Sequence, residues 1–554
     1  MDNSTEPPFP QALVDAFRRH PASPAFEHRS RTVTRGDVLA LVGRCVAALR
    51  AAGFGPTSSL ALATGVTPEG FAAQIAAHLL GCRVTGLRPG LTPAQLAHVL
   101  AGGVDAVIAD ADTARPELLA AARRTAAPGG IPVLRLETDL LAEPAPGDEP
   151  PCRGLLDRGL VARGRPDDIA LVHLTSGSTG HPKGCAVTYR ALTAFWAWQP
   201  ARWDTRITRL AAGYRRFLLF GTLTSAVMFE HLGLCLLGGG TAVIPDPPLE
   251  FPAVVERHRV TALLMTVPRL HHVLDTLRTE GPRATDLSGL RVAIVAGSPL
   301  APHKLAEAVE RIGPAVHQAY GQTETGMLTL LTPDDLAHGT DDVLTSVGRP
   351  WAETELSVRD AEGEPLPPGA TGEVWARTPC AMAGYWRDPE ESAEVLRGDW
   401  VRTRDIGHLD PAGHLHLTGR ARDVVIVNAI VHYTGPIERA IAAHDDVDQA
   451  YVVAAPDDET GEAAHAFVVP APGRAPELAA LREHVAAELG VTGLPSTLTV
   501  LAEAPVAASG KPDRRALLAR VTAARTAARD DAPRVHRRAG TASRRTPPDG
   551  SPVP

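Results

Sequence analysis

The chain has 554 residues, which is too long for one hydrophobic core, so two or more domains are expected. Hydrophobic residues make up 44% and charged residues 21%, a composition typical of a globular protein and not of a disordered or fibrous chain. The formal net charge of −8 gives no electrostatic reason to expect nucleic acid as the main partner.

The cysteines and the apolar stretches predict where the protein resides. Its six cysteines are scattered, with neither a CxxC pair nor a metal-ligand spacing, so a disulfide framework or structural zinc site is not expected. The acidic N-terminus lacks the order of a signal peptide, and the most apolar stretch, 217–244, is interrupted by Glu230 and His231. These features predict a cytoplasmic protein with no membrane partner and no nucleic-acid partner.

Helical and strand-like patterns alternate over the first 160 residues. Such alternation predicts parallel βαβ units. The predicted elements are a helix from Gln11, a helix over 37–52, a strand over 59–64, a helix over 68–80, and strands over 82–87 and 104–110.

The alternation resumes at Ala170, and the pattern then changes twice. The apolar runs 261–267 and 290–297 are typical of strands buried on both faces. After Val343, short strand-and-turn units predict an antiparallel or barrel-like subdomain. A compact α+β unit follows from Asp423, with strands over 450–455 and 463–469. The end of the chain is rich in Arg, Pro, Ser and Gly, which predicts a disordered tail.

The predicted fold class is therefore α/β. It comprises a large N-terminal domain of βαβ-type parallel sheets with a small β-barrel-like subdomain, followed by a small mobile α+β C-terminal domain. The expected boundaries are 1–420 for the large domain, 421–520 for the C-terminal lid and 521–554 for the tail.

A loop between an apolar strand and Lys183 carries the most information about function. Small residues let backbone amides approach an anion, the hydroxyls add donors, and the lysine adds a positive charge. Pro182 and Gly184 exclude a Walker A loop. Polyphosphate is the predicted ligand, and a Ser/Gly surface linker is the alternative. The loop residues are Thr175, Ser176, Gly177, Ser178, Thr179 and Gly180.

This loop resembles the signature of the adenylate-forming (AMP-binding) superfamily, which includes acyl- and aryl-CoA synthetases, peptide-synthetase adenylation domains and luciferases. Other segments resemble the family's remaining motifs in the same order, so the resemblance covers roughly residues 10 to 520. These segments are 319–326, 372–379, 382–386, 400–410, 419–423 and 508–515.

The resemblance implies an ATP-dependent, AMP-forming enzyme in which the oxygen of an acid attacks the α-phosphate of ATP and pyrophosphate leaves. It implies ATP and Mg²⁺ as cofactors, and it assigns the β- and γ-phosphates to Lys183 and the loop. Glu324 matches the magnesium carboxylate, Thr175 is placed near the metal, and Thr323 is placed against phosphate.

The resemblance also places the nucleoside and the C-terminal lysine. Tyr320 should stack on adenine, with the turn Gly297, Ser298 and Pro299 along the base edge. Asp405 suits the ribose hydroxyls, because a carboxylate accepts two hydrogen bonds. Arg420 should bond ribose or phosphate, with a salt bridge across the hinge as the alternative. Lys511 should bridge the acid and the α-phosphate in the adenylation step only, and Arg422 occupies the hinge position.

Three departures from the family pattern bear on substrate and acceptor. Ala429 stands where CoA ligases normally have Gly, which weakens the assignment of CoA. Arg404 stands where relatives have Gly, beside Asp405, and is expected either to pair with an acid or to alter the nucleotide pocket. Arg215 and Arg216 lie where an aromatic-His element is usual. They are tentative ligands of an anionic substrate group, with a solvated arginine pair as the alternative.

The leading interpretation is an acid–CoA ligase acting on a small-molecule acid that the sequence does not name. The alternative is the same adenylation with a carrier-protein thiol or an amine as acceptor, including nitrite activation of the diazotase kind. A non-catalytic adenylate-binding homologue is a third hypothesis. Against it stands the retention of Lys183, Glu324, Asp405, Arg420 and Lys511.

Overall fold

The structure is a computed structural model of the whole chain, divided into two compact units, Met1–Glu503 and Ala504–Pro554. The described residues are 6–125, 130–142, 159–175, 182–280, 285–297, 300, 302–339, 341–420, 424–428, 430–471, 473–490, 494–502, 504–505 and 513–531.

Within the described residues, the largest sheet has nine strands in the order β15-β14-β13-β12-β11-β9-β10-β1-β2. The strands from β13 to β1 are parallel, whereas β14, β15 and β2 pair antiparallel at the two edges. The strands are β1 (Pro24–His28), β2 (Arg31–Thr34), β9 (Arg216–Leu218), β10 (Thr241–Ile244), β11 (Ala262–Thr266), β12 (Val292–Ala296), β13 (Val316–Gln322), β14 (Gly326–Leu331) and β15 (Arg349–Pro350).

The second sheet, counted over the same described residues, has seven strands in the order β18-β8-β7-β4-β3-β5-β6. Its strands from β7 to β6 are parallel, and β8 and β18 add antiparallel at one edge. The strands are β3 (Ser59–Ala63), β4 (Arg83–Gly86), β5 (Ala106–Ala109), β6 (Val133–Arg135), β7 (Ile169–Thr175), β8 (Lys183–Thr188) and β18 (Gly384–Tyr385).

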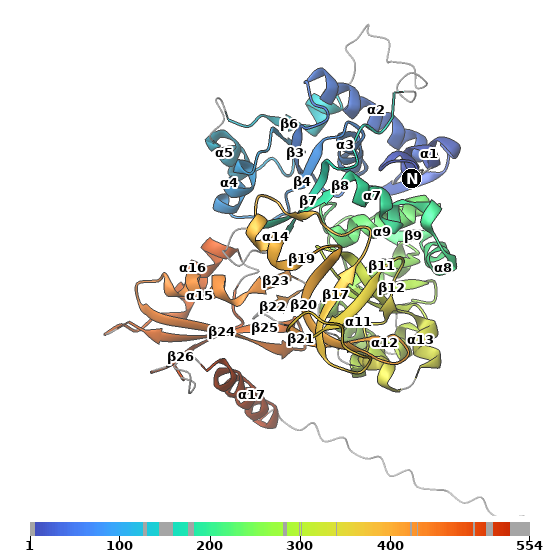
Figure 1. Ribbon diagram of the computed structural model, residues 1–554. Coiled ribbons are helices and arrows are strands. Elements are labelled where there is room, and N and C mark those ends of the chain that lie inside the picture. The colour runs from blue at the N-terminus through green and yellow to red at the C-terminus, as the bar shows by residue number, and fades with distance from the viewer. Residues whose placement is uncertain are drawn as a thin grey trace, which may run out of the picture. The chain divides into compact units, whose positions relative to one another are not determined.

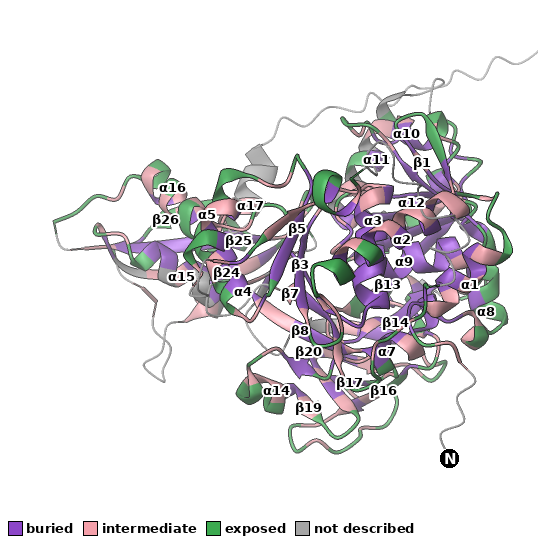
Figure 2. Ribbon diagram, turned by 90° about the horizontal axis from the view of Figure 1, so that it is seen from above, coloured by how far each residue is buried: buried purple, intermediate pink, exposed green. Residues whose placement is uncertain are grey.

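Alternate residues of the parallel strands enter different hydrophobic cores, as strands covered on both faces require. Leu264 and Ile294 join the core that also contains α2 (Arg35–Ala51), α3 (Pro68–Leu79) and α9 (Ala226–Leu237). Leu263 and Val295 join the core against α11 (Val267–Glu280) and α12 (Pro302–Ile312). The same alternation in β3 separates the first core from a third core against α4 (Pro93–Ala101) and α5 (Pro116–Arg124). Two sheets and three helix layers therefore alternate, and α11 and α12 can be followed beside β11 and β12 (Figure 1). In Figure 2, β3 and β5 have the colour of buried strands.

The helices of this part begin at capping residues that the sequence supplies. For example, Thr34 and Asp37 form a capping box at α2, as do Thr92 and Gln95 at α4. The helices are α1 (Gln11–Arg19), α2 (Arg35–Ala51), α3 (Pro68–Leu79), α4 (Pro93–Ala101), α5 (Pro116–Arg124), α7 (Tyr189–Ala194), α8 (Thr205–Gly213), α9 (Ala226–Leu237), α10 (Ala253–Arg257), α11 (Val267–Glu280), α12 (Pro302–Ile312), α13 (Pro333–His338) and α14 (Pro389–Val395).

A third, wholly antiparallel sheet follows, as the strand-and-turn pattern predicts. It runs β16-β17-β20-β19, with β21 paired to β20. Its strands are β16 (Glu355–Arg359), β17 (Gly372–Arg377), β19 (Leu396–Arg397), β20 (Trp400–Leu409) and β21 (Leu415–Arg420).

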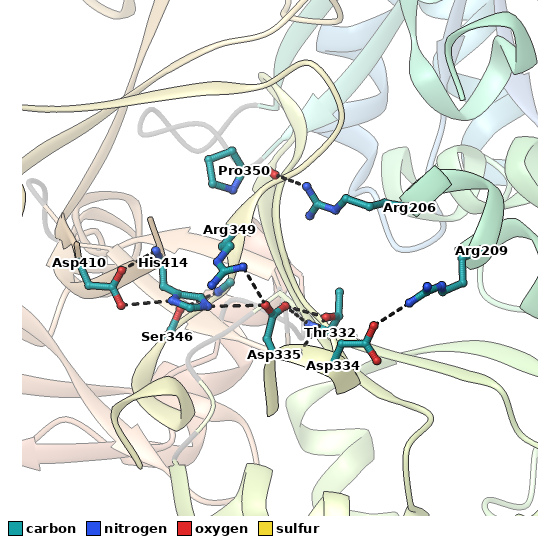
Figure 3. A network of polar contacts seen from close by, with 11 residues as sticks. Arg206, Arg209, Thr332, Asp334, Asp335, Ser346, Arg349, Pro350, Asp410 and His414 are labelled. Atoms are coloured by element: carbon teal, nitrogen blue, oxygen red, sulfur yellow. Dashed lines mark hydrogen bonds and ion pairs between the residues drawn. The ribbon is translucent and has the colours of Figure 1, made fainter. Parts of the chain in front are cut away.

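A polar network ties the β20–β21 hairpin to the end of the nine-stranded sheet. His414 lies between two carboxylates, with Nδ1 3.2 Å from Asp410 Oδ2 and Nε2 3.7 Å from Asp335 Oδ1 (Figure 3). Asp335 also caps α13 through Thr332 and lies 3.5 Å from Arg349. These contacts hold the hairpin that carries Asp405 in place against α13.

The C-terminal α+β part of the first unit has a sheet in the order β23-β22-β25-β24, with β26 paired to β25. Its apolar face packs against two helices through Ile437, Ile441 and Leu481. The elements are β22 (Val424–Val427), β23 (Ile430–Tyr433), α15 (Thr434–Ala442), β24 (Val447–Asp457), β25 (Gly461–Pro470), α16 (Leu478–Leu489) and β26 (Thr497–Val500).

The second unit contains helix α17, Arg514–Asp531. The helix continues past residue 521, where the tail was expected to begin, so the first part of that segment is helical. Residues 532–554 lie outside the described residues.

The predicted α/β class, the parallel sheets and the small α+β part are confirmed. The exact domain boundaries stay predictions.

Candidate active site

The β7–β8 hairpin positions the two described residues that flank the predicted phosphate loop. Thr175 ends β7 and lies directly opposite Lys183, the first residue of β8. The Thr175 hydroxyl donates to the carbonyl oxygen of Lys183 over 3.4 Å. The other predicted loop residues, Ser176, Gly177, Ser178, Thr179 and Gly180, lie outside the described residues.

The absence of a side chain at Gly184 lets Val172 of β7 and Trp386, which follows β18, approach β8 closely. A Cβ at Gly184 would lie 2.5 Å from Val172 Cγ1 and 3.2 Å from the Cβ of Trp386. Without it, the Trp386 amide donates to the Gly184 carbonyl over 2.6 Å. This close approach places Tyr385 opposite Cys185 and next to Lys183.

Tyr385 links the predicted phosphate lysine to the predicted magnesium carboxylate. Its hydroxyl donates to Glu324 Oε1 over 2.9 Å, and Lys183 Nζ lies 5.4 Å from the centre of its ring. No role for Tyr385 was predicted from the sequence. The available signal was its place in the motif segment 382–386.

Glu324 is held in the turn between β13 and β14. A bulge at Gly321 shapes this turn, where a Cβ would lie 2.3 Å from the Gly326 carbonyl. The Met382 amide donates to the Glu324 carbonyl over 2.8 Å. Thr323 lies half-buried in the same turn. Burial, together with the Glu324 carboxylate beside it, raises the pKa of the Cys185 thiol well above its ordinary value, so this cysteine stays neutral.

Tyr320 and Asp405, the predicted adenine and ribose residues, meet across two sheets. The Tyr320 hydroxyl donates to Asp405 Oδ2 over 2.7 Å, and Asp405 is only 3% exposed. Asp405 pairs in register with Arg420 of β21. Gly297, at a φ of +95°, follows the last residue of β12, next to β13. The carboxyl ends of the neighbouring parallel strands β12 and β13 thus bring Gly297 and Tyr320 to one edge, where Asp405 of β20 meets Tyr320.

Lys183 takes part in an ion-pair chain that the sequence did not reveal. Its Nζ lies 3.1 Å from Glu391 Oε1, and Nη1 of Arg404 lies 2.6 Å from the same oxygen. Burial alone would raise the pKa of Glu391, but the hydrogen bonds and charges of Arg404 and Lys183 outweigh it and lower this pKa. Arg404 therefore pairs with acids, which is the first of the two outcomes expected for it.

Arg215 and Arg216 lie elsewhere in the structure. Arg216 is the first residue of β9 and binds Glu27 through two hydrogen bonds of 2.6 and 2.7 Å. It therefore lies at the amino edge of the parallel strands, whereas Tyr320 lies near the carboxyl end of β13. Arg215 is exposed. Arg216 already has a carboxylate partner, and the role of Arg215 as a substrate ligand stays a prediction.

Several predicted positions have no described geometry. These are Ser298, Pro299, Arg422, Ala429 and Lys511, together with the side chain of Arg420. Their roles stay predictions.

Comparison with known proteins now identifies the family. Residues 13–386 match the family of AMP-binding enzymes, and residues 436–511 match the AMP-binding enzyme C-terminal domain. The chain belongs to the AMP-binding enzyme family. It is an adenylate-forming ligase.

Similar AMP-binding enzymes differ in the acceptor that their names imply. Feruloyl-CoA synthase from Amycolatopsis sp is 32% identical, over 90% of this chain and 96% of that protein. The fatty acid–[acyl-carrier-protein] ligase ScoC from Streptomyces coeruleorubidus is 29% identical, over 92% of this chain and 96% of that protein. The solved structure of the amide bond synthetase McbA from Marinactinospora thermotolerans has a TM-score of 0.80 and 32% identity, over 92% of this chain and 99% of that chain.

The described residues of this AMP-binding enzyme fit ATP and a magnesium ion. Lys183 supplies a cation and Glu324 a carboxylate, on two sides of Tyr385. The part of the chain that the structure describes contains no cluster of three metal-ligating side chains. A lone carboxylate suits Mg²⁺, which is commonly held by one or two carboxylates together with the phosphates of a substrate.

Lysine is rare in this AMP-binding enzyme, which adds weight to two motif positions. The sequence contains 3 lysines, Lys183, Lys304 and Lys511, against 52 arginines. Arginine replaces lysine almost everywhere else as a cation, but it cannot supply the compact ammonium of lysine.

None of the described helices is long and apolar enough to span a bilayer.

Proposed function

We propose that this enzyme adenylates a small carboxylic acid with ATP and Mg²⁺ and transfers the acyl group to the thiol of CoA. The observation that carries the proposal is the junction of three sheets at which the described site residues meet. Tyr385 joins Lys183 to Glu324, and Tyr320 joins the nine-stranded sheet to Asp405.

The chemistry requires two anions, a carboxylate and a polyphosphate, to approach each other. Positive charge that is already in position when the reaction begins is usually the largest single contribution to lowering such a barrier. In our proposal Lys183, Thr323 and the loop from Thr175 to Gly180 hold the β- and γ-phosphates. Glu324, with Thr175 nearby, holds Mg²⁺, which neutralises charge on the phosphate oxygens.

The nucleoside lies in our proposal at the edge that carries Tyr320, Gly297 and Asp405. Asp405 accepts from the ribose hydroxyls, since the hydroxyl of Tyr320 already orients its carboxylate. Arg420 bonds ribose or phosphate. A lid from about residue 421 to 520 brings Lys511 to the α-phosphate by rotation about Arg422.

An amine acceptor is the second candidate, because two observations favour it. Ala429 replaces the glycine that CoA ligases normally have, and an amide bond synthetase has a TM-score of 0.80 with this chain. A carrier-protein thiol is the third acceptor to be tested.

Pyrophosphate release, measured with a panel of carboxylic acids, identifies the acid substrate. Adding different acceptors to the same assay identifies the molecule that receives the acyl group in the second step. Each acid is incubated with ATP, Mg²⁺ and enzyme, alone and with CoA, a set of amines or a phosphopantetheinylated carrier protein. Acid-dependent AMP release that CoA accelerates, with formation of acyl-CoA, supports the proposal. If only an amine accelerates AMP release and an amide is formed, the acceptor is an amine and the assignment of CoA is contradicted. ATP binding without turnover of any acid contradicts both.

The Tyr385→Phe variant is expected to lower kcat/KM for adenylation about tenfold, because Glu324 loses a charge-assisted hydrogen bond. ATP–pyrophosphate exchange, measured over a range of free Mg²⁺ concentrations, tests this. The variant should need more Mg²⁺ to reach half its maximal rate, since the carboxylate is no longer oriented. An unchanged Mg²⁺ dependence with an equally reduced maximal rate would show that the hydroxyl does not act through Glu324.

A further inference from the structure

The ion-pair chain at Lys183 places a protein carboxylate where an anionic ligand would bind. Glu391 Oε1 lies 3.1 Å from Lys183 Nζ and 2.6 Å from Nη1 of Arg404, so one oxygen is shared by two cations. The side chains of Lys183, Glu391 and Arg404 are 11%, 15% and 15% exposed. At such low exposure an unpaired charge is strongly disfavoured, so each of these charges needs a partner.

Arg404 is the unusual member of the chain. Its φ of +61° lies in the left-handed region, which favours glycine, and the family resemblance predicts Gly at this position. The chain nevertheless has an arginine here, and its guanidinium bridges Glu391 and Glu394, the latter at 3.1 Å. Both acids lie on α14, so Arg404 joins strand β20 to that helix.

Together these contacts describe an exchange of partners. Lys183 must leave Glu391 to bind phosphate, and a carboxylate with no second cation would resist the loss of Lys183. Because Arg404 contacts the same oxygen, Glu391 remains paired after Lys183 leaves. The two charge pairs therefore allow Lys183 to change partner without leaving a buried charge alone.

We propose that Glu391 is a positioning residue that holds the ammonium of Lys183 until a phosphate of ATP replaces it, and that Arg404 keeps Glu391 paired during this exchange. This inference rests on the proposed function, in which Lys183 binds the phosphates of ATP. Glu391 acts through Lys183 and lowers the apparent affinity for ATP. Because Arg404 also pairs with Glu391, it weakens the hold of Glu391 on Lys183.

The KM for ATP in ATP–pyrophosphate exchange tests the proposal. Glu391→Gln removes the competing charge and should lower this KM about 3- to 10-fold with little change in kcat. Arg404→Gly suits the left-handed backbone but removes one of the two cations that contact Glu391. Because Glu391 then depends on Lys183 for its pairing, the KM for ATP should rise by a similar factor. Arg404→Lys keeps a cation and should restore most of the wild-type value. In the double variant E391Q/R404G, the effect of R404G should vanish.

A matched control is available on the same strand. Glu373 pairs with Arg402 of β20 at 2.7 Å and has no contact with Lys183 among the described interactions. Glu373→Gln removes an equivalent carboxylate–arginine pair and should leave the KM for ATP unchanged. A merely structural role for Glu391 predicts that E391Q and E373Q both lower thermal stability and kcat, and that E391Q leaves the KM for ATP unchanged. That result would overturn the proposal.

The rarity of lysine permits a second measurement that needs no turnover. With 3 lysines in the chain, trace labelling with acetic anhydride followed by peptide mass analysis reports on Lys183 separately. Labelling of Lys183 should be faster in E391Q, because no carboxylate holds the ammonium, and slower in R404G. ATP with Mg²⁺ should protect Lys183 in all three proteins.

The two measurements distinguish failure of the inference from failure of the proposed function. If ATP protects Lys183 and the wild type adenylates an acid, but E391Q changes neither the labelling rate nor the KM for ATP, the inference alone is overturned. If ATP does not protect Lys183 and no acid is adenylated, the proposed function fails and the inference fails with it.

Discussion

Replacing Lys183 by alanine is expected to reduce kcat/KM for adenylation about 100- to 1,000-fold, the loss typical of a preorganised charge at a reacting phosphate. The variant should fold normally, because Glu391 keeps its 2.6 Å contact with Arg404 after the lysine is lost. ATP–pyrophosphate exchange with the best acid of the panel measures the loss, and thermal unfolding checks the fold.

Two variants make the Lys183 result specific. Lys304→Ala, at the one lysine of the sequence that lies outside every motif, should leave the exchange rate unchanged. Lys183→Arg keeps the charge but not the compact ammonium, so it should recover only part of the activity. Full activity of Lys183→Ala would contradict the assignment of this residue to phosphate.

Replacing Lys511 by alanine is expected to separate the two half-reactions. Adenylation should fall about 100- to 1,000-fold, since the charge that bridges the acid and the α-phosphate is lost. Transfer of the acyl group from a chemically prepared acyl-adenylate should remain close to the wild-type rate, because the family resemblance assigns Lys511 to the first step only. Single-turnover assays of each step measure the difference.

The controls for Lys511 follow from the two-step scheme. Lys183→Ala should also leave transfer from the supplied adenylate largely intact, because the β- and γ-phosphates have already left. Equal loss of both half-reactions in Lys511→Ala, with an unchanged thermal transition, would contradict delivery of this lysine by a rotating lid.

Much of the fold could be predicted from local patterns. Alternating helix and strand patterns predicted the parallel sheets, and the apolar runs 261–267 and 290–297 correspond to β11 and β12, which are covered on both faces. Such runs are readable because a strand buried on two sides has no polar alternation. The end of α17 was missed, because its arginine-rich sequence is typical of a solvated segment.

The candidate site was predicted less evenly. Lys183, Glu324, Tyr320 and Asp405 were named from motifs, and the structure brings them into two groups, one held by a cation–π contact and a hydrogen bond through Tyr385 and one by a hydrogen bond between Tyr320 and Asp405. Arg216 shows the limit of this reasoning. An arginine in an unusual segment suggested a substrate ligand, but its partner Glu27 lies 189 residues away on β1, where no local pattern reveals it.

The class of chemistry could be read from the chain alone, because its motifs are contiguous and each carries residue types that ATP adenylation requires. The −8 net charge and the scarcity of lysine are likewise properties of composition. The partners of the motif residues, in contrast, are visible only in the folded chain. Tyr385 contacts Glu324, and Lys183 contacts Glu391, across long stretches of chain. Such contacts depend on how sheets and helices pack in three dimensions. The spacing of residues along the sequence does not determine that packing.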